Sequence, residues 1–136
     1  MTREAVIHKP KILVVEDSKT YLQFVTGVLT KAGYEVLSAS NAWVTNIVNQ
    51  ERPDLILMDV QLGAVSGVAA VTALRKRNFC SGIKILLHSS EPSAALAEMA
   101  KSCGADGYLP KEGSEERLLQ GIRQALHSSA KEKVGA

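Results

Sequence analysis

The chain has 136 residues, of which 46% are hydrophobic and 22% charged, a composition typical of one ordinary globular domain. This length allows a buried core but leaves no room for a catalytic domain plus a separate reader domain. A formal net charge of +2 gives no general attraction to nucleic acid or to an anionic membrane, so we expect neither as a partner.

The apolar segments are short, and their length indicates where in the cell the protein is expected. None approaches the length needed to cross a bilayer, and the polar start is not followed by a secretory-type segment, so we expect a cytoplasmic protein. Cys80 and Cys103 lack the spacing of metal ligands, and two cysteines are too few to staple a domain of this size. Both are expected to be reduced and structural.

Strand and helix patterns alternate along the chain. Residues 1–10 show no periodicity and are expected to be a loose leader, while the small, polar residues 128–136 predict a frayed tail. Between them, in the predicted domain 11–127, strands are expected over 11–15, 35–38, 54–58, 83–88 and 106–109, and helices over 19–32, 41–50, 66–77, 93–102 and 114–127.

This alternation predicts the fold class. Short, continuous runs of Val, Ile and Leu suit parallel strands covered on both faces, and right-handed crossovers place helices on both sides of the sheet. We therefore expect an α/β fold with a doubly wound, five-stranded parallel sheet. Polar side chains positioned to cap helix starts support the predicted helices, namely Ser18, Asn41, Ser66 and Ser114, and Gly33 is expected as a left-handed cap.

Four of the predicted strands end at polar residues. Glu16 and Asp17 follow the first, Asp59 the third, Ser89 lies at the end of the fourth, and Lys111 follows the fifth. The carboxyl ends of parallel strands converge on one crevice, so we expect these side chains to be neighbours. Two carboxylates about 4 Å apart repel by roughly 1 kcal/mol in water and about 4 kcal/mol at an effective dielectric of 20. A divalent cation would relieve this repulsion, and oxygen ligands without His or Cys favour Mg²⁺ or Mn²⁺ over zinc.

Such a site suits phosphoryl transfer. The metal and Lys111 would neutralise the phosphoryl oxygens while one carboxylate attacks phosphorus to give an acyl phosphate. Asp59 is the expected nucleophile, because it directly follows the central strand, whereas Glu16 and Asp17 form a pair suited to binding metal. Ser89 would present its hydroxyl to a phosphoryl oxygen.

The order and spacing of these motifs resemble those of a response regulator receiver domain of bacterial two-component signalling, of the stand-alone, chemotaxis-regulator-like kind. The resemblance covers residues 11–127 and rests on Ile12–Asp17, Pro53–Asp59, Gly67, Ser89, Gly104–Leu109 and Lys111. It implies a flavodoxin-like strand order of 2-1-3-4-5.

The resemblance also implies roles for individual residues. Asp59 would accept a phosphoryl group from the phosphohistidine of a histidine kinase or phosphotransfer protein. Asp17, Asp59 and the Gln61 backbone carbonyl would bind Mg²⁺, with help from Glu16. Ser89 and Tyr108 match the family's switch pair. Phosphorylation would then change how the face made by the fourth helix, fifth strand and fifth helix binds an output protein, or pairs as a homodimer.

Several positions depart from the family pattern. Gly63 replaces a usual proline and predicts a more mobile loop with weaker metal binding. Glu112, not proline, follows Lys111, so a cis bond there is not expected. Gln61 and Glu91 occupy positions that influence dephosphorylation, which leaves the phosphoryl lifetime open. The three histidines match no receiver role, and Trp43 is expected to pack on the second helix.

Other interpretations remain open. Asp59 and Lys111 could form a purely structural ion pair in a degenerate, phosphate-independent receiver, and Tyr108 could simply fill a half-buried strand position. A small aspartyl-phosphate phosphatase or phosphotransferase would use the same nucleophile, but the dehalogenase-type motif needs an Asp where Gln61 stands. Flavodoxin-like electron transfer would need a phosphate-binding loop after the first strand, which the chain lacks.

Overall fold

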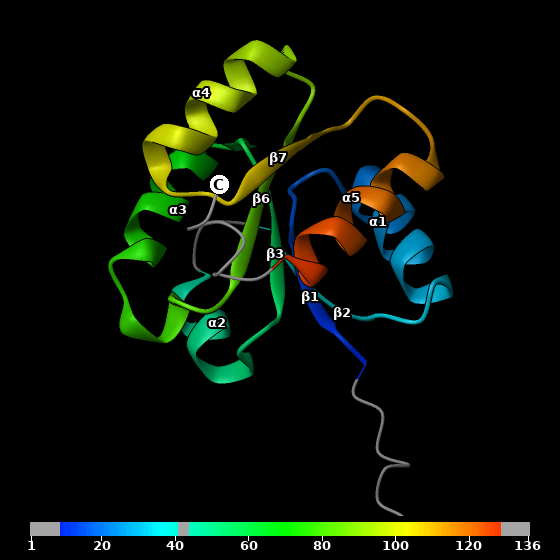
Figure 1. The fold of residues 1–136 in the computed structure, drawn as a ribbon, viewed down its shortest axis with the longest axis horizontal. Coiled ribbons are helices and arrows are strands. Elements are labelled where there is room, and N and C mark those ends of the chain that lie inside the picture. Colours follow the sequence, from blue (N-terminus) through cyan, green and yellow to red (C-terminus); the bar gives the residue numbers. More distant parts are fainter. Residues whose placement is uncertain (1–8, 41–43, 129–136) are drawn as a thin grey trace, which may run out of the picture.

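The structure, a computed structural model, describes residues 9–40 and 44–128. Its main sheet has five parallel strands in the order β2-β1-β3-β6-β7 (Figure 1). These strands are β1 (Lys11–Val15), β2 (Glu35–Ala39), β3 (Leu55–Asp59), β6 (Lys84–Ser89) and β7 (Gly107–Pro110). The parallel sheet and its flavodoxin-like order are confirmed.

Five α-helices cover the two faces of this sheet. They are α1 (Lys19–Lys31), α2 (Thr45–Glu51), α3 (Gly67–Arg75), α4 (Ser93–Cys103) and α5 (Glu115–His127). Helices α1 and α5 lie on one face, and α2, α3 and α4 on the other (Figure 1). The doubly wound arrangement follows from right-handed crossovers between parallel strands.

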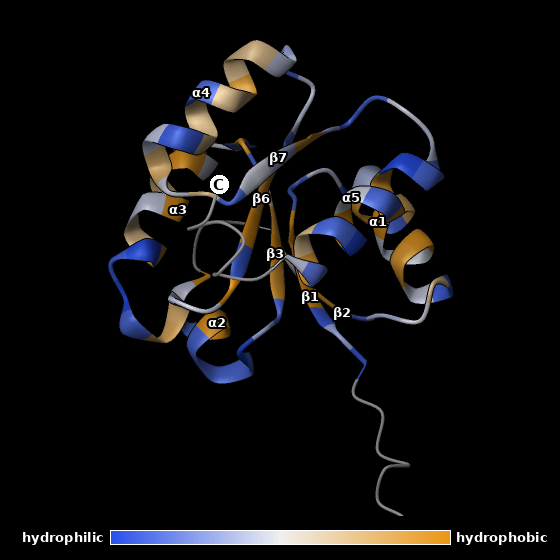
Figure 2. Ribbon diagram, in the orientation of Figure 1, coloured by the Kyte–Doolittle hydropathy of each residue, from blue (hydrophilic) through white to orange (hydrophobic). Residues whose placement is uncertain are grey.

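The core consists of two apolar layers, one on each face of the sheet. Alternate residues of each strand enter opposite layers: in β3, Ile56 packs toward α2, α3 and α4, whereas Leu57 packs toward α1 and α5. All five β3 residues are buried, as expected for the central strand of a covered parallel sheet. Figure 2 shows the consequence, because the strands are hydrophobic while hydrophilic residues lie on the outer faces of the helices.

Three of the predicted helix caps are present. The side chains of Ser18, Ser66 and Ser114 accept hydrogen bonds from backbone N–H groups in the first turns of α1, α3 and α5. Gly33 takes the left-handed conformation after α1, with φ of 100°.

Helix α2 differs from its predicted span of 41–50. It begins at Thr45 after Val44, which provides no side-chain cap, and the predicted cap Asn41 and Trp43 lie outside the described residues. At its other end α2 runs one residue further than predicted, to Glu51, and stops there because Arg52 takes the left-handed conformation, with φ of 47°. The Arg52 side chain donates hydrogen bonds back to Asn49.

The structure contains three short elements that the sequence does not predict, two after β3 and one after α3. Strands β4 (Gln61–Leu62) and β5 (Val65–Ser66) form an antiparallel hairpin, and a 3₁₀ helix spans Asn78–Cys80. Elements this short carry too few residues to show a periodicity. Gly63 sits in the hairpin turn with φ of 62°, a conformation that glycine adopts without strain. Among the described residues, no helix is both long enough and apolar enough to cross a membrane.

Candidate functional site

A cavity of about 960 Å³ opens at the carboxyl ends of the strands. Residues from three strand ends line it together: Glu16 and Asp17 after β1, Asp59 at the end of β3, and Ser89 at the end of β6. Lys111, directly after β7, also lines it. The structure thus brings together side chains spread over most of the domain, as the parallel topology predicts.

Three carboxylates form an acidic cluster in this cavity. One carboxylate oxygen from each of Glu16, Asp17 and Asp59 lies within 4.8 Å of the other two. Glu16 and Asp59 are buried, with 2% and 6% of their surface exposed, whereas Asp17 is exposed to solvent. Such a set of oxygen donors, open on one side, suits a hard divalent cation that keeps several of its waters.

Lys111 supplies the positive charge of the site. Its Nζ lies 2.8 Å from Glu16 Oε1 and 3.6 Å from Asp59 Oδ1. Its backbone N–H donates to the Ser89 carbonyl oxygen at 2.9 Å, which extends the pairing of β6 and β7. The ammonium group is therefore held between the two buried carboxylates, closer to Glu16.

The environment of Asp59 favours its neutral form. Burial raises the pKa of Asp59 to about 6; Lys111 opposes the shift, and the neighbouring charge of Glu16 adds to it. Because the folded-state pKa lies above the usual 3.8, ionising Asp59 destabilises the folded protein. A bound cation would favour the charged carboxylate instead.

This pKa has a measurable consequence for stability. In Mg²⁺-free buffer, the stabilising contribution of protonated Asp59 should be lost as the pH rises from about 4 through about 6. We expect Asp59→Asn, which cannot ionise, to gain about 2 kcal/mol in unfolding free energy relative to wild type between pH 4 and pH 7.5. Urea unfolding of both proteins from pH 4 to pH 7.5 measures this gain. If the difference in unfolding free energy between Asp59→Asn and the wild type did not change with pH, the raised pKa of Asp59 would be wrong.

The two predicted switch residues differ in exposure. Ser89 is buried, and its Oγ accepts a hydrogen bond from the Glu91 backbone N–H at 3.1 Å. Tyr108 lies on β7 with 36% of its surface exposed.

The segment after Asp59 folds back over the site. The Gln61 backbone N–H donates to Asp59 Oδ1 at 3.3 Å, while the Gln61 side chain is exposed. Gly63 also lines the cavity, as part of the β4–β5 hairpin. The peptide between Lys111 and Glu112 is trans.

Tyr21 and His88, for which the sequence predicts no role in the site, lie against Lys111 and its strand. The Tyr21 ring centroid is 4.5 Å from Lys111 Nζ, and its hydroxyl is 2.7 Å from His88 Nε2. Burial lowers the pKa of His88 to about 4 and raises the pKa of Tyr21 to about 12, so both side chains are neutral near pH 7. The only sequence signal for this pair is a histidine within an otherwise apolar strand.

The amino-acid sequence is similar to a protein-family model and to several known proteins. The sequence model of the response regulator receiver domain matches residues 12–123. Protein PilH of Pseudomonas aeruginosa is 33% identical over 117 residues, covering 85% of this chain and 97% of PilH. Polar-differentiation response regulator DivK of Brucella anthropi is 26% identical, covering 85% of this chain and 94% of DivK. Some relatives are much longer: the chain spans 17% of a rice two-component response regulator-like protein, PRR37.

Solved structures agree with the fold. Chemotaxis protein CheY4 of Vibrio cholerae superimposes with a TM-score of 0.81 at 30% identity, covering 87% of this chain and 99% of CheY4. A response regulator from Chloroflexus aurantiacus superimposes with a TM-score of 0.83 at 23% identity, covering 89% of this chain and all of that one, which supports the fold alone.

Proposed function

Because the chain belongs to the response regulator receiver domain family, we propose that it is a signalling switch controlled by phosphorylation of Asp59. Receiver domains are signalling proteins and not enzymes that turn over external substrates. The observation that carries the proposal is the placement of one ammonium group, Lys111 Nζ, between the buried carboxylates of Glu16 and Asp59, with Asp17 beside them.

The acidic cluster is the proposed Mg²⁺ site, which Mn²⁺ could also fill. Asp17, Asp59 and the Gln61 backbone carbonyl would bind the ion, and Glu16 would assist through water. The donor set fits, since three carboxylate oxygens lie within 4.8 Å of one another. When bound, the ion neutralises charge on the phosphoryl oxygens and keeps Asp59 ionised.

The residues of the chain supply the other parts of the reaction. An Asp59 carboxylate oxygen attacks phosphorus, the bond between phosphorus and the donor histidine nitrogen breaks, and an acyl phosphate forms. Lys111 neutralises a developing oxygen charge, for which its ammonium group is already placed near Asp59 Oδ1, at 3.6 Å. The donor would be a histidine kinase or a phosphotransfer protein in the cytoplasm.

Ser89 and Tyr108 would convert the new charge into a change of surface. A phosphoryl group adds roughly −1.5 to −2 charges and strong acceptor oxygens. The Ser89 hydroxyl would move from the Glu91 N–H to a phosphoryl oxygen, and the exposed Tyr108 ring would turn into the vacated space. The face formed by α4, β7 and α5 would then bind an output protein, or a second copy of the chain, with altered affinity.

Labelling by a small phosphodonor such as acetyl phosphate tests this proposal. We expect the wild type to be phosphorylated only with Mg²⁺ present, and Asp59→Asn to take up no label. Asp54→Asn is a matched control, because Asp54 is exposed and pairs with the Lys11 N–H at the opposite edge of the sheet. It should be labelled like the wild type.

Each other outcome points to a different function. A wild type without label would favour the degenerate receiver, and label surviving in Asp59→Asn would move the nucleophile elsewhere. Sustained release of phosphate from an unrelated monoester would favour the phosphatase.

A further inference from the structure

An aromatic and imidazole pair lies beneath Lys111, on the face of the sheet covered by α1 and α5. Tyr21 comes from the first turn of α1, where its backbone N–H donates to the Ser18 cap at 3.2 Å. His88 comes from β6, in register with Asp59 on one side and Leu109 on the other. The pair therefore connects α1 to the strands that carry the phosphoacceptor and the lysine.

The hydrogen bonds of His88 fix its tautomer. The Leu109 carbonyl oxygen, 2.6 Å from His88 Nδ1, can only accept a hydrogen bond, so Nδ1 carries the proton. Nε2 then has a free lone pair and accepts from the Tyr21 hydroxyl at 2.7 Å. His88 is 3% exposed, so water does not compete for these bonds. The chain of donors runs in one direction, from the Tyr21 hydroxyl through His88 to the backbone of β7.

These two hydrogen bonds hold the Tyr21 ring where it faces the ammonium group of Lys111. The ring centroid is 4.5 Å from Nζ, within the range of a cation–π contact. The same Nζ contacts Glu16 Oε1 and Asp59 Oδ1. Because the Lys111 side chain is only 17% exposed, the contact is largely shielded from water, which strengthens it.

We propose that Tyr21 and His88 position Lys111 for phosphoryl transfer to Asp59, with the ring restricting the ammonium group and the imidazole anchoring both the ring and β7. This proposal rests on the proposed phosphorylation of Asp59. Lysine is a flexible chain with a point charge, so its reach toward a forming phosphoryl group depends on what limits its motion. Lys111 Nζ lies closer to Glu16 Oε1, at 2.8 Å, than to Asp59 Oδ1, at 3.6 Å, and the proposed role of the Tyr21 ring is to keep the ammonium group within reach of both carboxylates.

Rates of phosphorylation by acetyl phosphate at saturating Mg²⁺ test the proposal. We expect Tyr21→Leu and Tyr21→Met to be phosphorylated about 3- to 10-fold more slowly than wild type, the loss of a typical cation–π contact. Tyr21→Phe keeps the ring but loses the hydrogen bond to His88, so its rate should lie between those of the wild type and Tyr21→Leu, within about twofold of the wild type. Tyr34→Leu is the matched control, because Tyr34 is a partly buried tyrosine of the same apolar layer that lines a separate cavity with Asp54, and its replacement should not affect the rate.

A spectroscopic readout separates positioning from general stability. In NMR spectra, the ring should shift the Lys111 ε-methylene protons upfield in the wild type and in Tyr21→Phe, and this shift should disappear in Tyr21→Leu and Tyr21→Met. The proposal would be overturned if these two variants were phosphorylated as fast as Tyr34→Leu, or if their Lys111 chemical shifts matched those of the wild type. If the wild type took up no label, the proposed function would be wrong. The NMR comparison would still show whether Tyr21 restrains Lys111.

Discussion

Replacing Gly67 with alanine should destabilise the protein by about 3 kcal/mol and prevent phosphorylation of Asp59. A Cβ at this position would lie 1.9 Å from the Asp59 carbonyl oxygen and 2.9 Å from its carbonyl carbon. Both are backbone atoms and cannot rotate away. The close approach is maintained by the Gly67 N–H, which donates to the Val60 carbonyl oxygen at 2.7 Å. Accommodating the methyl group must therefore push α3 away from the end of β3, and with it displace the phosphoacceptor.

Glycine 27 offers a matched control for this substitution. It lies on the exposed side of α1, and nothing lies within 4 Å of a Cβ built there. We expect Gly27→Ala to stabilise the protein by about 0.5 to 1 kcal/mol, because alanine is the better helix former. Urea midpoints and acetyl phosphate labelling of both variants make the comparison. If Gly67→Ala were as stable and as readily labelled as Gly27→Ala, the close packing of α3 on β3 would be wrong.

Replacing Arg75 with leucine should cost about 3 to 5 kcal/mol in unfolding free energy. Its guanidinium group forms a 2.6 Å ion pair with Asp106 and donates to the carbonyl oxygens of Gly104, Cys80 and Ile83. In Arg75→Leu each of these acceptors loses the donor that Arg75 provides. They lie where α3, the 3₁₀ helix, β6 and the end of α4 meet. Unsatisfied buried acceptors are what make such losses large.

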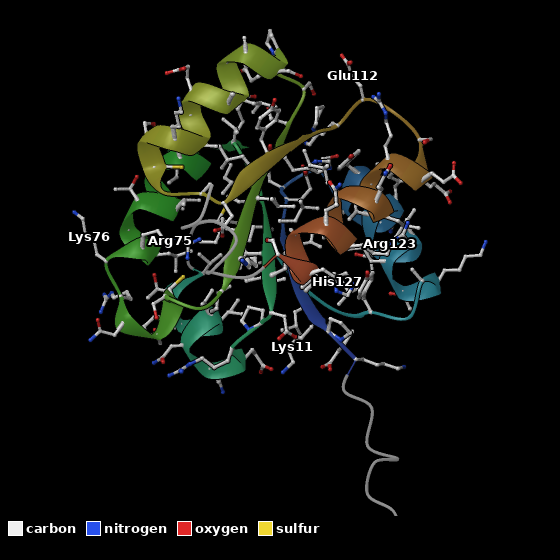
Figure 3. The ribbon with its side chains drawn as sticks, viewed as in Figure 1. Lys11, Arg75, Lys76, Glu112, Arg123 and His127 are labelled. Carbon is white, nitrogen blue, oxygen red and sulfur yellow. The ribbon has the colours of Figure 1, made fainter. Side chains whose placement is uncertain are left out.

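The substitution Arg75→Lys should recover less than half of this loss, because a lysine cannot reproduce the planar fork of donors. Lys76→Leu is the surface control: Lys76 extends outward from α3, whereas Arg75 lies on the inner side (Figure 3). We expect this control to change stability by no more than about 0.5 kcal/mol. Chemical denaturation of the three variants checks the order, and an Arg75→Leu midpoint equal to that of Lys76→Leu would refute it.

The site shows which features the amino-acid sequence alone can predict. Glu16, Asp17, Asp59, Ser89 and Lys111 were predicted to converge, and they line one cavity, because strand ends in a parallel sheet meet at the same edge. The raised pKa of Asp59 could not be predicted, since it depends on burial and on the charge of a residue 43 positions away in the chain (Glu16). Exposure of the Tyr108 ring is likewise a property of packing.

Local chemistry in the sequence determined the alternation of strands and helices, three helix caps and the positions at which the strands end, because apolar periodicity and capping depend only on neighbouring residues. The tertiary structure decided what depends on contacts between distant segments. The β4–β5 hairpin, the approach of Gly67 to the Asp59 backbone, and the Tyr21–His88 support of Lys111 are of this kind. Each of these three features joins residues whose distance and orientation in space do not follow from any pattern along the chain.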